Sequence, residues 1–163
     1  MVEVSPRFVQ NWCAKELLQL FEQIDLRNVV GEARFANIST EAGPKPLILI
    51  ADDEKDLVNA LEEFFEKSGY AVATAYNGVE AIEKINRQKP HLILLDLMMP
   101  VMDGFQVLEQ LRRDQKDTPV IVLSGLGEQT GDIAISLGAN IYLQKPYSFS
   151  ELEHQARKLL RSA

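Results

Sequence analysis

From Lys45 to the end of the chain, short apolar runs alternate with segments whose apolar residues recur at helical spacing. The apolar runs are residues 46–51, 70–75, 91–97, 120–123 and 140–143. Apolar residues three or four positions apart predict helices near 54–68, 79–87, 105–111, 128–137 and 148–161. The third run, HLILLDL, is continuously apolar, as expected of a strand covered on both faces. The pattern predicts an α/β domain with an open, parallel, doubly wound sheet.

The first 45 residues have a different pattern. Ser5-Pro6 is a helix-start signal, and the apolar residues that recur after it are Val9, Cys13, Leu17, Leu20 and Ile24. They predict an amphipathic helix over about 6–26, followed by a linker that contains STEAGPKP. We therefore divide the chain into a helical extension with its linker, residues 1–45, and a main domain, residues 46–163.

The apolar stripe of this N-terminal helix has to be covered by something. Three alternatives stay open: packing on the main domain, pairing with the same helix of a second copy in a homodimer, or docking of another protein. A linker between the helix and the domain suggests that the helix faces elsewhere, which favours the homodimer.

Polar side chains stand where the predicted strands end. The first strand is followed by Asp52 and Asp53, the third reaches Asp96, the fourth is followed by Ser124, and Lys145 comes just after the fifth. Parallel strands bring their carboxyl ends to one edge of the sheet, so these groups would converge. Three carboxylates need cations close by. Lys145 supplies one charge, and Mg²⁺, which binds one or two carboxylates with water and phosphate, would supply the rest.

This set of groups suits phosphoryl transfer, with a carboxylate nucleophile, a metal, a lysine and a hydroxyl donor. Each residue also has an ordinary explanation when taken singly, because an Asp after a strand often caps the next helix. Asp96 is harder to explain in that way. It interrupts the most apolar stretch of the chain, where an uncompensated carboxylate is costly.

The strings ILIADDE, LILLDLMMPVMDG, PVIVLSG and YLQKPYS, in this order and spacing, resemble the receiver domain of two-component response regulators. The resemblance covers roughly residues 46–161. It implies a flavodoxin-like (βα)5 fold with five parallel strands in the order 2-1-3-4-5. It also implies a signalling switch that is not an enzyme in the usual sense, since it phosphorylates itself from a donor and slowly loses the phosphate.

The resemblance implies a role for each matching residue. Asp96 would accept a phosphoryl group from a histidine kinase or a phosphotransfer protein. Asp53, Asp96 and the backbone carbonyl of Met98 would bind Mg²⁺ directly, and Asp52 would act through a metal-bound water. Lys145 would pair with the phosphoryl oxygens.

The switch itself is also implied by the resemblance. Ser124 would move to hydrogen-bond the phosphoryl group, and Tyr142 would rotate inward into the space that it vacates. The face formed by helix 128–137, strand 140–143 and helix 148–161 would change as a result. Pro146 would follow a cis peptide bond. Met98 and Leu126 cannot orient an attacking water, so we expect a long-lived phosphorylated form.

Composition adds limits on partners and compartment. The net charge of −7 argues against a protein that binds a phosphate backbone. A single cysteine, no secretory signal and no apolar run of membrane-spanning length indicate a cytoplasmic protein without a membrane partner. Because the chain ends two residues after the last predicted helix, we expect output through a downstream protein target and no direct binding of nucleic acid.

Three alternatives compete with a receiver switch. A phosphohydrolase of the haloacid-dehalogenase type needs a second Asp two residues after the nucleophile, and Met98 occupies that position. A flavodoxin-like cofactor binder would need a Gly-rich phosphate loop after the first strand, which the sequence lacks. A receiver that has lost phosphorylation is disfavoured by the intact acidic set and by Lys145.

Overall fold

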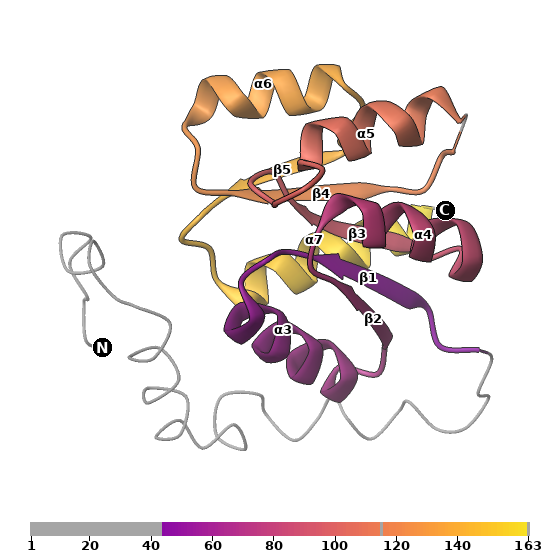
Figure 1. The fold of residues 1–163 in the computed structure, drawn as a ribbon. Helices are drawn as coiled ribbons and strands as arrows, with labels where there is room; N and C mark the ends of the chain where they lie inside the picture. Colours follow the sequence, from indigo (N-terminus) through magenta and orange to yellow (C-terminus); the bar gives the residue numbers. More distant parts are fainter. Residues whose placement is uncertain (1–43, 115, 163) are drawn as a thin grey trace, which may run out of the picture. The chain divides into compact units, whose positions relative to one another are not determined.

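The computed structural model describes residues 44–114 and 116–162, and of residues 128 and 162 it describes the backbone alone. In this part of the chain, five strands alternate with five helices (Figure 1). The strands are β1 (Leu47–Ala51), β2 (Ala71–Ala75), β3 (Leu92–Asp96), β4 (Val120–Ser124) and β5 (Ile141–Gln144). The helices are α3 (Lys55–Lys67), α4 (Gly78–Gln88), α5 (Gly104–Arg113), α6 (Glu128–Ser136) and α7 (Phe149–Ser162). The helix predicted over residues 6–26 lies outside the described residues.

All neighbouring strands pair in parallel, in the order β2-β1-β3-β4-β5. The predicted doubly wound fold and its strand order are therefore confirmed. The chain first moves outward from β1 to β2 and then crosses back to β3 on the other side of β1. This reversal of direction makes the carboxyl ends of β1 and β3 the topological switch point, where sheets of this kind place their ligands.

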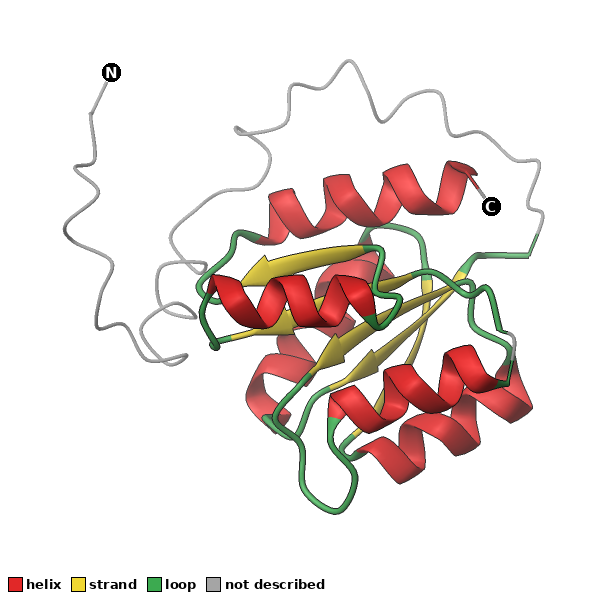
Figure 2. Cartoon of the chain, turned by 90° about the horizontal axis from the view of Figure 1, so that it is seen from above, coloured by secondary structure: helices red, strands yellow, loops and turns green. Residues whose placement is uncertain are grey.

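Helices cover both faces of the sheet (Figure 2), and a separate core lies on each face. Alternate residues of each central strand point to opposite faces, so Leu49 joins one core and Ile48 the other. The first core is completed by residues of α4, α5 and α6. The second is completed by residues of α3 and α7, including Phe65 and Leu152. The central strands are buried on both faces, which explains their continuous apolar runs.

Helix α5 begins directly beside the end of β3. The Asp103 side chain accepts a hydrogen bond from the Gln106 backbone N–H, and the Gln106 side chain accepts one from the Asp103 N–H, which forms a capping box. A β-carbon at Gly104 would lie 2.2 Å from the backbone oxygen of Asp96. Only glycine lets the start of α5 come this close to the strand that carries Asp96.

Arg112 connects two loops at the amino ends of the strands, opposite the edge that carries Asp96. Its guanidinium donates to the Gly138 carbonyl at 2.7 and 3.1 Å, to the Thr118 carbonyl at 3.2 and 3.3 Å, and to the Lys116 carbonyl. One side chain thus satisfies backbone acceptors both before β4 and before β5.

Among the described residues, none of the helices has the length and apolar character needed to cross a membrane.

Candidate phosphoacceptor site

Asp96 is the last residue of β3, a strand whose five residues are all buried. The residue is only 5% exposed. One carboxylate oxygen accepts a hydrogen bond from the Met98 backbone N–H, and the other accepts one from the Lys145 ammonium group at 2.9 Å. The buried carboxylate that the sequence placed at a strand end therefore has charged and backbone partners at the carboxyl edge of the sheet.

Lys145 joins Asp96 to a second buried carboxylate. The same ammonium group lies 2.8 Å from Asp52, which is 3% exposed and follows β1. The other oxygen of Asp52 accepts the Glu54 backbone N–H at 2.9 Å. The backbone N–H of Lys145 donates to the Ser124 carbonyl at 2.8 Å, which holds the start of the β5–α7 loop against the end of β4. Three sequence-predicted residues thus form one bridged ion pair.

The electrostatics of this cluster follow from its burial. Burial is the largest influence on Asp96 and raises the pKa of its carboxyl group, while Lys145 opposes the shift and Asp52 adds to it. Burial alone would lower the pKa of Lys145, but the hydrogen bonds and charges of Asp52 and Asp96 outweigh it and raise that pKa. Lys145 therefore stays protonated, and the two carboxylates hold a negative charge that is only partly neutralised.

Ser124 and Tyr142 are connected through the loop between β4 and α6. Ser124 is fully buried, and its hydroxyl oxygen accepts the Leu126 backbone N–H at 3.2 Å. The Tyr142 hydroxyl donates to the Leu126 carbonyl. The ring of Tyr142 is partly buried and packs against the core beneath α4, α5 and α6. The sequence named both residues, but the Leu126 main chain that links them could not be read from the pattern.

Asp53 and Met98 occupy different positions from the buried ion pair. Asp53 is exposed, and Met98 is 62% exposed while its backbone N–H contacts Asp96. In the described ranges, no group of three or more His, Cys, Asp or Glu side chains is arranged to hold a metal ion. Since Mg²⁺ usually takes one or two carboxylates together with water and phosphate, the hard oxygens of Asp52 and Asp96 still fit such an ion.

Two further features near this edge were not predicted. The Tyr147 hydroxyl is buried without a hydrogen-bond partner among the described residues, and burial raises the pKa of its phenol. Val101, in the loop after β3, is 86% exposed and has a φ of 68°, a region that β-branched residues rarely adopt. Neither feature leaves a signal in hydrophobic spacing. The Lys145–Pro146 bond is cis, as the resemblance implied.

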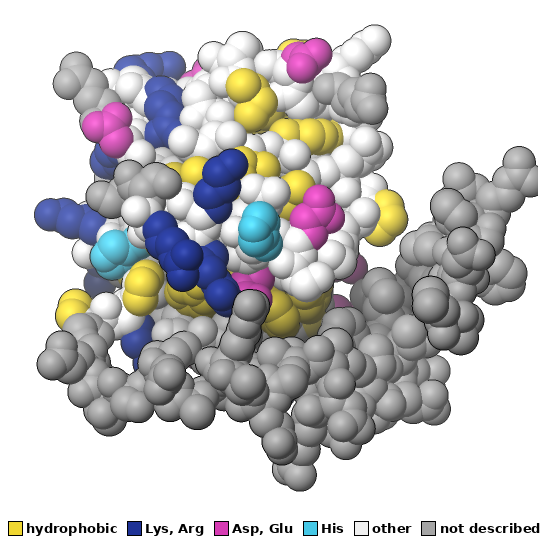
Figure 3. All heavy atoms as spheres, turned by 180° about the vertical axis from the view of Figure 1, so that it is seen from behind, with side chains coloured by type: hydrophobic (Ala, Val, Ile, Leu, Met, Phe, Trp, Pro, Cys, Tyr) yellow, Lys and Arg dark blue, Asp and Glu magenta, His cyan; other side chains and the backbone are white. Residues whose placement is uncertain are grey.

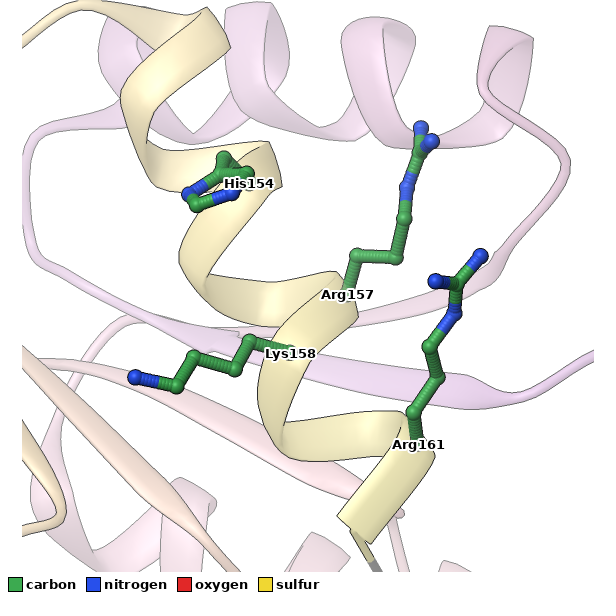
Figure 4. A pocket seen from close by; sticks show the side chains of 4 residues that line it. All are labelled: His154, Arg157, Lys158 and Arg161. Atoms are coloured by element: carbon green, nitrogen blue, oxygen red, sulfur yellow. The ribbon is translucent and has the colours of Figure 1, made fainter.

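The two histidines lie apart from the site. His91 is exposed, and its Nδ1 accepts the Leu47 backbone N–H at 3.0 Å. His154 is exposed on α7, where a hollow in the surface is lined by His154, Arg157, Lys158 and Arg161 (Figure 4). Figure 3 shows that Lys and Arg side chains gather on one face of the molecule. A net charge of −7 therefore does not describe every face of this protein.

A protein-family model described as the response regulator receiver domain matches residues 48–157. This chain is a member of that family. The receiver domain is 39% identical over 115 residues to the alkaline phosphatase synthesis transcriptional regulatory protein PhoP of Bacillus subtilis, a match that covers 70% of this chain and 48% of PhoP. The chain thus spans about half the length of the curated relatives it matches.

Solved structures give the same result. The receiver domain of the Francisella response regulator 1452 is 34% identical, has a TM-score of 0.70, and is matched over 98% of its length and 72% of this chain. A CheX–CheY–BeF3–Mg²⁺ complex from Borrelia burgdorferi is 28% identical, with a TM-score of 0.67, over 70% of this chain and 88% of that one. Receiver domains are signalling switches of two-component systems, and the haloacid-dehalogenase alternative is not favoured.

One expectation from the sequence is wrong. We expected no direct binding of nucleic acid, but the curated relatives are named transcriptional regulators, a class of proteins that binds DNA. The expectation rested on net charge and on the position of the chain end. Net charge is a sum over all faces of a molecule, so it does not exclude a basic surface. The match covers only about half of each relative, so the position of the chain end does not exclude nucleic-acid binding either.

Proposed function

We propose that this receiver domain is a phosphorylation-dependent switch in a two-component or phosphorelay pathway, with Asp96 as phosphoacceptor. The observation that carries the proposal is the bridged ion pair. Asp96 and Asp52 are almost fully buried, and a single ammonium group contacts both at 2.8–2.9 Å. Two carboxylates with one cation leave net negative charge in a buried site, which further cationic or polar ligands would offset.

The chemistry is a transfer of one phosphoryl group. A histidine kinase or phosphotransfer protein would supply it on a histidine nitrogen. An Asp96 carboxylate oxygen forms the new bond to phosphorus as the nitrogen–phosphorus bond breaks, and the donor histidine keeps the electron pair. Lys145, which contacts Asp96, would pair with the phosphoryl oxygens, and the buried Ser124 hydroxyl would donate a hydrogen bond to one of them.

Magnesium is the proposed cofactor. Asp52, Asp53, Asp96 and the Met98 carbonyl would hold it, and its charge would neutralise phosphoryl oxygens during transfer. Two buried carboxyl groups that share one ammonium group support this role, because a further cation beside them would favour the ionised form of Asp96 that attacks phosphorus.

The signal would leave through the surface of α6, β5 and α7. Tyr142 lies on β5 and contacts the loop that follows Ser124. A movement of Ser124 toward a phosphoryl group would therefore shift this loop and change the position of Tyr142 at the surface. The added charge would be local to the phosphorylated residue, and the surface of α6, β5 and α7 would change its conformation in response, as in other phosphorylation switches.

The test is phosphorylation by a small donor. The full chain is incubated with acetyl phosphate and Mg²⁺, and intact mass is compared for the wild type, Asp96→Asn and Asp103→Asn. We expect one added phosphoryl group on the wild type and on Asp103→Asn, whose side chain still caps α5, and none on Asp96→Asn. A wild type that gains no phosphate, or an Asp96→Asn variant that gains as much, would overturn the proposal. The first result would instead indicate a receiver that has lost phosphorylation.

A further inference from the structure

Helix α6 carries a glycine whose missing side chain leaves room for Tyr142. A β-carbon built on Gly131 would lie 2.8 Å from Cδ1 of the Tyr142 ring, and 3.1 and 3.2 Å from Cγ and Cε1. Carbon atoms in van der Waals contact are about 3.5–4.0 Å apart. All three of these contacts involve one aromatic ring, so any side chain at position 131 would displace Tyr142 in particular.

The displaced ring would lose a specific contact. With its ring against Gly131, Tyr142 donates its hydroxyl to the Leu126 carbonyl. The backbone N–H of Leu126 in turn donates to the Ser124 hydroxyl oxygen at 3.2 Å. A continuous path of contacts therefore runs from α6 through β5 to the main chain beside Ser124.

We propose that Gly131 is a positioning residue for phosphorylation of Asp96. By leaving space for the Tyr142 ring, it lets the tyrosine hydroxyl hold the main chain of Leu126, and this fixes the loop that places the Ser124 hydroxyl. The inference rests on the proposed function and adds to it a residue of α6 that touches neither phosphate nor metal. It also makes the identity of residue 131 a determinant of how readily this receiver reaches its phosphorylated state.

The loop supplies a matched control for the same substitution. Gly127 precedes α6 with φ −68° and ψ 178°, a backbone conformation that alanine adopts without strain, and a β-carbon there meets nothing within 4 Å. Gly127→Ala therefore adds the same atoms a few residues away, with no contact between the new β-carbon and Tyr142. It also keeps the Gly127 carbonyl, which accepts from the Tyr142 hydroxyl at 3.5 Å. Tyr142→Phe is the complementary variant, since it keeps the ring and removes only the hydroxyl donor.

The experiment measures the rate of phosphorylation by acetyl phosphate and Mg²⁺ for the wild type and these variants. Loss of one hydrogen bond predicts that Gly131→Ala and Tyr142→Phe each slow the reaction by about fivefold. The double variant should be no slower than either single variant, because both break the same link. Gly127→Ala should react at the wild-type rate. Wild-type rates for Gly131→Ala or Tyr142→Phe, or additive losses in the double variant, would overturn the proposal.

A second measurement separates this role from simple damage to the fold. Alanine is more favourable than glycine inside a helix, so Gly131→Ala should raise the urea midpoint of unfolding in a Tyr142→Ala background. With Tyr142 present, the clash with its ring should make the same substitution lower the midpoint. A shift of the urea midpoint in the same direction in both backgrounds would contradict the contact between Gly131 and Tyr142. This measurement needs no phosphate. If the wild type fails to accept phosphate, the proposed function fails, while the Gly131–Tyr142 contact is still decided by the two urea midpoints.

Discussion

Replacing Lys145 by methionine tests whether the bridged ion pair governs the electrostatics of the site. Lys145 keeps 26% of its side chain exposed, whereas both carboxylates that it contacts are nearly fully buried. Removing one member of a buried pair costs 3–5 kcal/mol, and the partial exposure of the lysine places this site near the lower end, at about 3 kcal/mol at pH 8. The variant keeps the length and the apolar stem of the side chain, so packing changes little.

The loss should depend on pH in a defined direction. Asp96 already has a pKa raised above its ordinary 3.8, chiefly by burial, and Lys145 opposes that shift. Without the lysine the pKa rises further, so the folded state keeps a proton that the unfolded state releases once the pH exceeds 3.8. Stability of the variant therefore falls as the pH rises. We expect the deficit relative to wild type to be smaller at pH 5 than at pH 8, because a larger share of Asp96 is protonated at the lower pH and then repels Asp52 less.

Urea unfolding followed by circular dichroism at pH 5 and pH 8 measures this directly. Lys67→Met is the matched control, because Lys67 pairs with Glu63 on the surface and both side chains are about two thirds exposed. Its cost should stay below about 1 kcal/mol. Addition of Mg²⁺ should restore part of the loss in Lys145→Met, since a divalent cation replaces the missing charge. A deficit under 1 kcal/mol at pH 8, or one equal at both pH values, would refute the ion-pair reasoning.

Three other outcomes can be tested with single variants. Val101→Asn should stabilise the domain by about 1 kcal/mol in urea unfolding, because asparagine tolerates the left-handed backbone at φ 68° and the exposed valine side chain gives up little packing; a loss of stability would contradict this. Arg112→Met removes donors to three backbone carbonyls and should cost about 2 kcal/mol, against under 1 kcal/mol for exposed Arg87→Met; equal costs would refute it. The phosphorylated form should persist for minutes in Mg²⁺, because Met98 cannot orient water, and decay within seconds would show otherwise.

Most of the fold could be predicted from the spacing of apolar residues. Every strand and helix after residue 45 was expected, because a parallel sheet covered on both faces leaves continuous apolar runs between helical repeats. The helix predicted over residues 6–26 and its homodimer fall outside the described residues and stay predictions, as does the boundary at residue 45.

The site was predicted in its composition but not in its geometry. The sequence put Asp52, Asp53 and Asp96 together, but only Asp52 and Asp96 share a lysine, and Asp53 is exposed. Successive residues leaving an extended strand point in opposite directions, so only one of two neighbouring aspartates turns inward. Spacing alone does not say which one. The Leu126 link and the φ of Val101 depend on loop backbone angles, which hydrophobic spacing does not encode.

The bridged ion pair joins parts of the chain that are far apart in sequence. Lys145 and Asp52 are separated by 93 positions, and Lys145 and Asp96 by 49. Contacts of such separation form only after long loops have closed, and they come late in folding. β1, β3 and β5 must therefore all be in register before the three groups meet. A chain that is still being synthesised, or one that has lost its last strand, cannot assemble the site, so competence for the proposed phosphorylation would also report that β1, β3 and β5 are in place.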